Sequence, residues 1–173
     1  MSLSLYEAAV PAFRQIVDSV GGVLAKGAAH YEAAGRSPDD LLNARLHEDM
    51  YPLTFQLHSV IHHSIGAIEG VKAGKFSPPS GLEGYDYAGF RKRLGEVSDE
   101  LASVKADELN AHEGKDVIFE VGDLRMDFTA EGFLLSFSKP NFYFHATTAY
   151  DILRMKGVPL GKLDYLGRPQ LKG

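Results

Sequence analysis

Residues 140–157, PNFYFHATTAYDILRMKG, carry the clearest helical pattern in this 173-residue chain. At about 100° per residue, the apolar side chains share one arc with a single histidine: Phe142, His145, Ala146, Ala149, Ile152 and Leu153. Asn141 and Thr148 lie at the edge of this arc, beside His145. Proline suits the first turn of a helix and glycine the position after its end, so Pro140 and Gly157 mark its limits. We predict an amphipathic helix with a small polar cluster on its buried face.

A second helical pattern, from Pro52 to about Ala73, contains three more histidines. Its apolar stripe consists of Leu57, Ile61, Ile65 and Ile68. His58 and His62 are four residues apart, so both imidazoles should project from one face, about one turn apart, with Glu69 on the same edge. This spacing suits a metal ion or an acid–base pair of side chains.

Two further helices are predicted from residues 4 to about 34 and from 87 to about 104. The first begins with the capping box S-L-Y-E, in which Ser4 and Glu7 satisfy each other's backbone donors. Together the four long amphipathic segments predict a mainly all-α fold, a four-helix bundle with one small β-hairpin before the last helix. A chain of this length without a shift in composition favours a single domain over residues 1–173.

The hairpin signal is VIFEV-GD-LRMDF, residues 117–128, in which apolar and polar residues alternate on both sides of a two-residue turn. This register places Glu120 opposite Arg125 and Phe119 opposite Met126, so that one face is apolar and the other carries an ion pair. A lone hairpin is marginally stable in water. We therefore expect it to pack on the helices or on another subunit.

Three connecting segments have weaker patterns. Residues 75–84, KFSPPSGLEG, are predicted to form a loop because of their proline, serine and glycine content. Residues 131–138 predict a further helix that Pro140 interrupts or restarts. The residues after Gly157 contain too much glycine and proline for a helix, and we expect them to lie along the protein surface.

Composition argues against several classes of function. The chain has 23 acidic and 18 basic residues, a net charge of −5, and no run of lysine or arginine, so nucleic acid is not an expected partner. It has no cysteine, which rules out disulfides, thiolate metal sites and a cysteine nucleophile. No apolar run is long enough to span a membrane, and the first residues do not resemble a signal peptide. A cytoplasmic protein is the expectation.

The last helix also resembles a known family. Its ending, LRMKGV at residues 153–158, is similar to the end of the fourth helix in the DinB-like (YfiT-like) four-helix-bundle superfamily, where it follows a His-x-x-x-His motif. The resemblance places that motif on Asn141 and His145, with Asn141 in place of the first histidine. It also implies that His58 is near the position of a third, metal-binding histidine, and that the protein forms a homodimer. His62 would then be the replacement ligand for a divalent ion such as zinc, nickel or iron.

Three functions stay open at this stage. The first is a divalent-metal-dependent transferase or hydrolase whose degenerate site contains His58, His62 and His145. The second is a small-molecule-binding or dimeric module that has lost the metal, because a carboxamide is a poor ligand for these metals. The third is a metal-free enzyme with His145 as acid or base. Asn141 and Thr148 are the candidate cofactor-binding residues. The alternative is that they only form hydrogen bonds with the ring nitrogens of His145 inside the core.

Two further histidines receive a simpler prediction. His63 points well away from His58 on the helical projection, and we predict that it lies on the surface. His47 lies in the connection before the second helix, near Glu48 and Asp49, and we interpret that cluster as solvated charges near a helix start. The sequence shows no nucleophilic triad, phosphate-binding loop or dinucleotide fingerprint.

Overall fold

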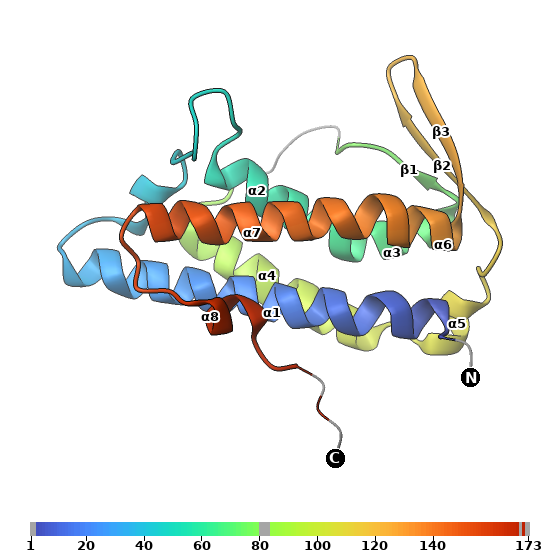
Figure 1. The fold of residues 1–173 in the computed structure, drawn as a ribbon, viewed down its shortest axis with the longest axis horizontal. Coiled ribbons are helices and arrows are strands. Elements are labelled where there is room, and N and C mark those ends of the chain that lie inside the picture. The colour runs from blue at the N-terminus through green and yellow to red at the C-terminus, as the bar shows by residue number, and fades with distance from the viewer. Residues whose placement is uncertain (1–2, 80–83, 170, 172–173) are drawn as a thin grey trace.

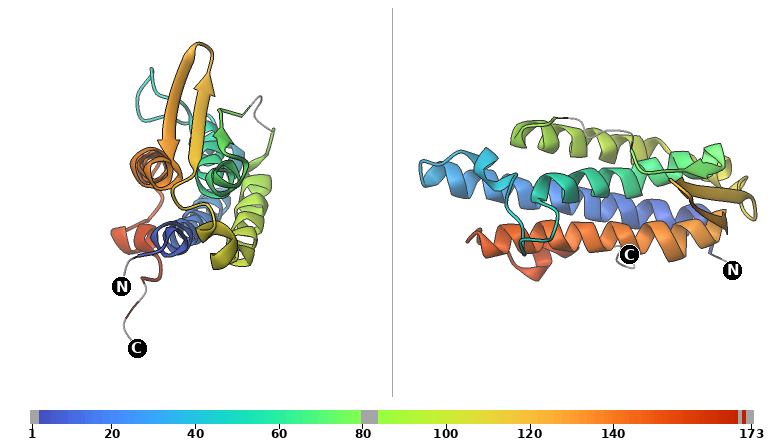
Figure 2. Two further views of the ribbon diagram at one scale, coloured as in Figure 1. Left: turned by 90° about the vertical axis from the view of Figure 1, so that its right-hand side faces the viewer. Right: turned by 90° about the horizontal axis from the view of Figure 1, so that it is seen from above.

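The computed structural model describes residues 3–79, 84–169 and 171. It is mostly helical, with a three-stranded sheet at one end. The helices and turns are α1 (Leu5–Ala33), η1 (Pro38–Leu41), α2 (Leu53–Ile61), η2 (His62–Gly66), α3 (Ala67–Ala73), α4 (Tyr87–Ser103), α5 (Ala106–Asn110), α6 (Ala130–Gly132), η3 (Phe133–Ser138), α7 (Lys139–Met155) and α8 (Lys162–Leu166). The strands are β1 (Lys75–Phe76), β2 (Asp116–Val121) and β3 (Leu124–Thr129). The long helices α1, α4 and α7 and the rod formed by α2, η2 and α3 lie side by side (Figures 1 and 2).

Helix α1 begins as the sequence predicts. The side chain of Ser4 accepts from the backbone of Glu7, and the Glu7 carboxylate accepts from the backbone of Ser4, so the capping box is complete. On its inner side, Phe13 meets Phe142 of α7 edge to face, with ring centroids 4.9 Å apart. Both rings are fully buried. Apolar burial of this kind is the main force that holds the helices together.

The second rod follows the predicted range but contains an unexpected π-helical turn. Residues His62–Gly66, between α2 and α3, form the turn η2. A π turn bonds each N–H to the carbonyl five residues back, and such turns are frequent at functional sites. Ser64, inside the turn, is buried and donates its hydroxyl to the carbonyl of Val60.

The expectation that Pro140 starts the last helix is confirmed, since α7 begins at Lys139 and Pro140 lies in its first turn, whereas the expected interruption is wrong. Helical structure runs without a break from Ala130 through η3 into α7. Proline lacks an N–H and collides with the carbonyl four residues before it in a regular helix. The π turn η3 ends directly before Lys139, and its wider spacing moves the preceding carbonyls, which lets the helix pass through Pro140.

The sheet has the order β1–β2–β3, and its hairpin stands out from the helices (Figure 1). β2 and β3 pair antiparallel in the register described above, with Glu120 opposite Arg125 and Phe119 opposite Met126. The predicted loop at residues 75–84 is wrong at its start, because Lys75 and Phe76 pair parallel to β2. Residues 80–83 of that segment lie outside the described part. Gly74, with a φ of 68°, makes the turn that brings β1 to the sheet.

The prediction for the residues after Gly157 is also corrected. Residues Lys162–Leu166 form α8, which lies against α1 and is held by two contacts. Lys26 pairs with Asp164 at 2.6 Å, and the amide of Gln15 donates to the carbonyl of Leu166 at 2.7 Å. None of the helices in the described ranges is both long and apolar enough for a membrane span.

Candidate ligand-binding site

A cavity of about 380 Å³ lies between the second rod, α7 and the sheet. Most of its lining consists of aromatic rings and imidazoles, and the described residues that line it include no carboxylate: Phe55, His58, Ser59, His62, His63, Phe76, Pro78, Pro79, Phe119, Phe137, Asn141 and His145. We call this cavity the histidine pocket. The two π turns adjoin it, since η2 supplies His62 and His63 and η3 supplies Phe137.

His145 is held in one orientation and one tautomer. Its Nδ1 lies 2.7 Å from Oε1 of Gln56, a residue that is 2% exposed. The amide nitrogen of Gln56 donates to the carbonyl of Tyr51 at 2.9 Å, which fixes the amide oxygen toward the imidazole. An amide oxygen only accepts hydrogen bonds, so Nδ1 must carry the proton. The other ring nitrogen, Nε2, is left with a lone pair. Burial lowers the pKa of His145 to about 4, so the ring is neutral at pH 7.

His63 does not lie on the surface, and that prediction is corrected. Its ring lies beside that of His145, with centroids 6.0 Å apart and planes inclined by 13°. The buried hydroxyl of Ser138 donates to the carbonyl of His63 at 3.0 Å and lies 3.3 Å from its Nδ1. Because that hydroxyl proton is already used, Nδ1 of His63 is the donor and Nε2 again has the lone pair.

Burial and the proximity of two other imidazoles both keep His63 neutral. Burial has the larger effect, followed by the imidazoles of His62 and His145, and together they lower its pKa to about 3. His63 and His145 are therefore a pair of uncharged rings, each held through Nδ1. The pocket can offer hydrogen-bond acceptors from two imidazoles without carrying positive charge.

His62 stacks on Phe76 of β1, with ring centroids 4.3 Å apart. Burial lowers its pKa, and a hydrogen bond to the backbone of Ser77 works in the opposite direction. Its Nε2 is buried and has no hydrogen-bond partner among the described residues. A buried polar atom without a partner is destabilising and is uncommon in folded proteins.

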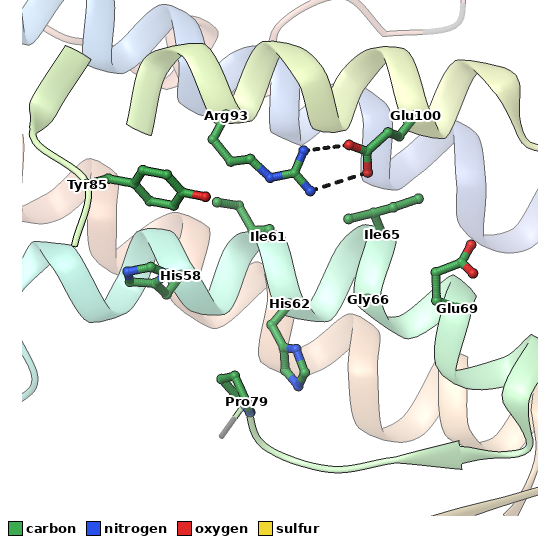
Figure 3. A pocket seen from close by; sticks show the side chains of 10 residues that line it. All are labelled: His58, Ile61, His62, Ile65, Gly66, Glu69, Pro79, Tyr85, Arg93 and Glu100. Atoms are coloured by element: carbon green, nitrogen blue, oxygen red, sulfur yellow. Dashed lines mark hydrogen bonds and ion pairs between the residues drawn. The ribbon is translucent and has the colours of Figure 1, made fainter. Parts of the chain in front are cut away.

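His58 lines the histidine pocket and also lies on the side of the rod toward α4. Its ring contacts those of Tyr85 and Phe90, at centroid distances of 5.8 and 4.9 Å. It lines a second cavity of about 350 Å³ between the rod and α4 (Figure 3). There Arg93 forms a two-pronged ion pair with Glu100, with N–O distances of 2.5 and 3.3 Å. The hydrogen bonds that Arg93 donates to the Glu100 carboxylate raise the pKa of Arg93. His58, His62 and Pro79 line both cavities.

The two candidate cofactor-binding residues differ in position. Asn141 lines the histidine pocket, and its amide nitrogen donates to the carbonyl of Phe137 at 2.7 Å, which leaves the amide oxygen as an acceptor. Thr148 is buried and donates to the carbonyl of Phe144 at 2.8 Å. Thr148 is not part of the pocket lining. His47 is exposed and pairs with Asp49 at 2.6 Å, away from this site.

The donor set is a poor fit to the metal that the family resemblance implies. His58, His62 and His145 line one cavity, but within the described ranges no three histidine, aspartate or glutamate side chains are arranged to hold an ion. His58 and His62 are stacked against aromatic rings, and no carboxylate lines the cavity in the part of the chain that the structure describes. Zinc sites in proteins normally have three or four such ligands. We therefore derive no chemistry from a metal.

The sequence reasoning missed Gln56 as a functional residue. A signal for it exists, because Gln56, Ser59 and His63 are spaced i, i+3 and i+7 on the second helix and so share one face. That polar face lies between apolar stripes and points toward α7. A glutamine at a core position with two polar neighbours on its face indicates a buried hydrogen-bond network.

Comparison with known proteins places the chain in a family. A family model described as a domain of unknown function, DUF1993, matches residues 5–166. The chain belongs to the DUF1993 family. A solved structure, described as the crystal structure of a DinB family member protein from Shewanella denitrificans, is similar at 26% identity and a TM-score of 0.77, covering 98% of this chain and 95% of that one. The DinB-like resemblance is thereby confirmed over the whole chain. No curated protein matches it.

Proposed function

We propose that this DUF1993 protein is a binding protein for a small, uncharged aromatic molecule that carries a hydroxyl or N–H group. The ligand would occupy the histidine pocket, with its ring among the aromatic side chains and its donor group on Nε2 of His145. The observation that carries the proposal is the Gln56–His145 hydrogen bond, because it leaves Nε2 of a neutral His145 as an acceptor in a cavity with a mainly aromatic and imidazole lining.

The size and composition of the pocket support this ligand class. A volume of about 380 Å³ is within the range of small-molecule sites, which are mostly apolar with a few well-placed polar groups. Aromatic rings from four elements line it, Phe55 of α2, Phe76 of β1, Phe119 of β2 and Phe137 of η3. These rings favour a flat apolar body through offset or edge-to-face contacts.

The charge state of the pocket argues against a charged ligand. His63 and His145 have pKa values of about 3 and 4, so neither is positive at pH 7. Among the described residues, the lining has no lysine, arginine, aspartate or glutamate. A carboxylate or ammonium group would lose its hydration there without meeting an opposite charge.

The enzymatic alternatives have less support. A general base works best with a pKa near the working pH, whereas that of His145 is about 4. A divalent-metal-dependent transferase or hydrolase would need ligands beyond the stacked imidazoles. Nε2 of His62 has no hydrogen-bond partner among the described residues, which favours a metal, and the experiment below therefore includes metal ions.

The test uses 2-naphthol as a probe, with naphthalene and 2-naphthoate as matched compounds. We expect 2-naphthol to raise the melting temperature and to perturb the His145 ring resonances in NMR spectra. Naphthalene should bind more weakly because it has no hydroxyl, by about fivefold to tenfold for the loss of one hydrogen bond of roughly 1–1.5 kcal/mol. The anionic 2-naphthoate should not bind at pH 7.

Two variants test whether the preference for 2-naphthol comes from His145. His145→Leu keeps an apolar side chain of similar bulk, and should remove the preference for 2-naphthol over naphthalene. His47→Leu, at an exposed histidine outside the pocket, should leave that preference unchanged. Equal binding of all three compounds by the wild-type protein would contradict the proposal. A rise in melting temperature with Zn²⁺, Ni²⁺ or Fe²⁺ that is lost in His145→Leu would instead indicate a metal site.

A further inference from the structure

We propose that β3 is a self-association surface, and that two copies of this chain pair their β3 strands antiparallel about a two-fold axis at Met126. This inference is independent of the ligand proposal. β3 is an edge strand, because the sheet order is β1–β2–β3. Exposed edge strands present unpaired backbone groups that readily pair with another chain.

The hairpin fixes which backbone groups of β3 are free. In a two-residue turn the carbonyl before the turn bonds the N–H after it, so Val121 and Leu124 form a hydrogen-bonded pair. Gly122 has a φ of 54°, as such a turn requires at its first position. Hydrogen-bonded and non-hydrogen-bonded pairs alternate along an antiparallel ladder. Arg125 and Asp127 are therefore in non-hydrogen-bonded pairs with β2, and their N–H and carbonyl groups point to the open edge.

The free groups of Arg125 and Asp127 limit the possible registers. Two copies can pair these groups about a two-fold axis at residue 125, 126 or 127. An axis at 125 places Arg125 opposite its own copy, and one at 127 does the same for Asp127. Like charges directly opposite are destabilising and opposite charges are stabilising. Of the three axes, only the one at Met126 places Arg125 of each copy opposite Asp127 of the other copy.

The apolar face supports the same register. An axis at Met126 places Leu124 opposite Phe128 of the second copy. Leu124 is 52% exposed in the single chain and Phe128 is partly buried, so the pairing would cover exposed apolar surface. The sequence Leu-Arg-Met-Asp-Phe is therefore complementary to itself on both faces of the strand.

The position of the hairpin makes this pairing accessible. It stands out from the helices, with its turn at the far end (Figures 1 and 2). In an antiparallel pair the two turns point in opposite directions, so the two helical bodies lie at opposite ends of the paired strands. A two-fold pairing of this kind closes and does not extend into a fibre.

Cross-linking tests the register directly, because the natural chain has no cysteine. Met126→Cys places two thiols opposite each other in a non-hydrogen-bonded pair, about 4.5 Å apart between Cα atoms, within the range for a disulfide. Diamide, which takes up the two thiol hydrogens, should convert this variant to a covalent dimer. Leu124→Cys is the matched control on the same face, and should not cross-link because it lies opposite Phe128. Equal cross-linking of both variants, or of neither, would overturn the register.

Reversing the charge at Arg125 or Asp127 tests the proposed dimer surface without a covalent cross-link. Wild-type protein should sediment at twice the 18.9-kDa chain mass, whereas Arg125→Asp and Asp127→Arg should each sediment as a monomer. An equimolar mixture of the two variants should recover the dimer, because every cross-strand pair then joins opposite charges. A monomeric wild type, dimeric single variants, or a mixture that stays monomeric would each contradict the proposal. Circular dichroism of both variants checks that they are folded.

Discussion

Acidification should destabilise this protein through His63. Burial and two neighbouring imidazoles lower the pKa of His63 to about 3, whereas an unfolded chain has a histidine pKa near 6.5. Between those two values the unfolded chain binds a proton that the folded chain does not. The free energy of unfolding therefore falls as pH falls through 6.5, and continues to fall until about pH 3.

The size of the effect follows from the same difference. One proton bound only by the unfolded chain changes stability by about 1.4 kcal/mol per pH unit. Lowering the pH from 7 to 5 should therefore remove about 2 kcal/mol through His63. His145 should add a loss of nearly the same size over this range, because its pKa of about 4 also lies below pH 5. Surface carboxylates titrate mainly below this window.

Urea unfolding at pH 7 and pH 5 measures this loss. In His63→Asn the side chain no longer titrates but can still hydrogen-bond Ser138, so we expect this variant to lose about 2 kcal/mol less than wild type between the two pH values. His47→Asn, at an exposed position, should keep the wild-type loss. The same pH dependence in wild type and His63→Asn would refute the reasoning, whatever the absolute stabilities.

Two other substitutions test the packing around the site and in the core. Gln56→Met removes the acceptor for Nδ1 of His145, and should weaken 2-naphthol binding by about fivefold to tenfold, measured by titration calorimetry, with only a small change in melting temperature. Gly27→Ala should destabilise the fold by about 1–3 kcal/mol in urea unfolding, because a Cβ there meets the Tyr87 hydroxyl and a methyl of Leu153. Adding Tyr87→Phe removes the hydroxyl, so the double variant should lose less free energy of unfolding than the sum of the losses in the two single variants. Additive losses of free energy would contradict this packing.

Local patterns were sufficient for most of the fold. The capping box at Ser4 and the alternation on both sides of Gly122 depend on residues close in sequence, and the structure has both features. β1 could not be found in this way, because two residues are too short for a periodic signal. It forms only because Ile118, more than 40 residues later, bonds the carbonyl of Gly74.

The site shows where helical phase is insufficient. The projection was right that His63 points away from His58. It was wrong to equate that direction with solvent, because the second rod is covered on two sides, by α4 and by α7. His58 faces the first and His63 faces His145 on the second. A single helix pattern gives the angle between two side chains, whereas burial depends on which neighbouring helices pack there.

The tautomer of His145 tests the central claim most directly. A two-dimensional NMR spectrum that correlates ring carbon-bound protons with ¹⁵N distinguishes the two neutral forms and the charged form of each histidine. The account predicts that His145 is neutral at pH 7 with its proton on Nδ1, and that it titrates near pH 4. A proton on Nε2, or a titration near the ordinary value of 6.5, would contradict the neutral acceptor on which the proposed binding depends.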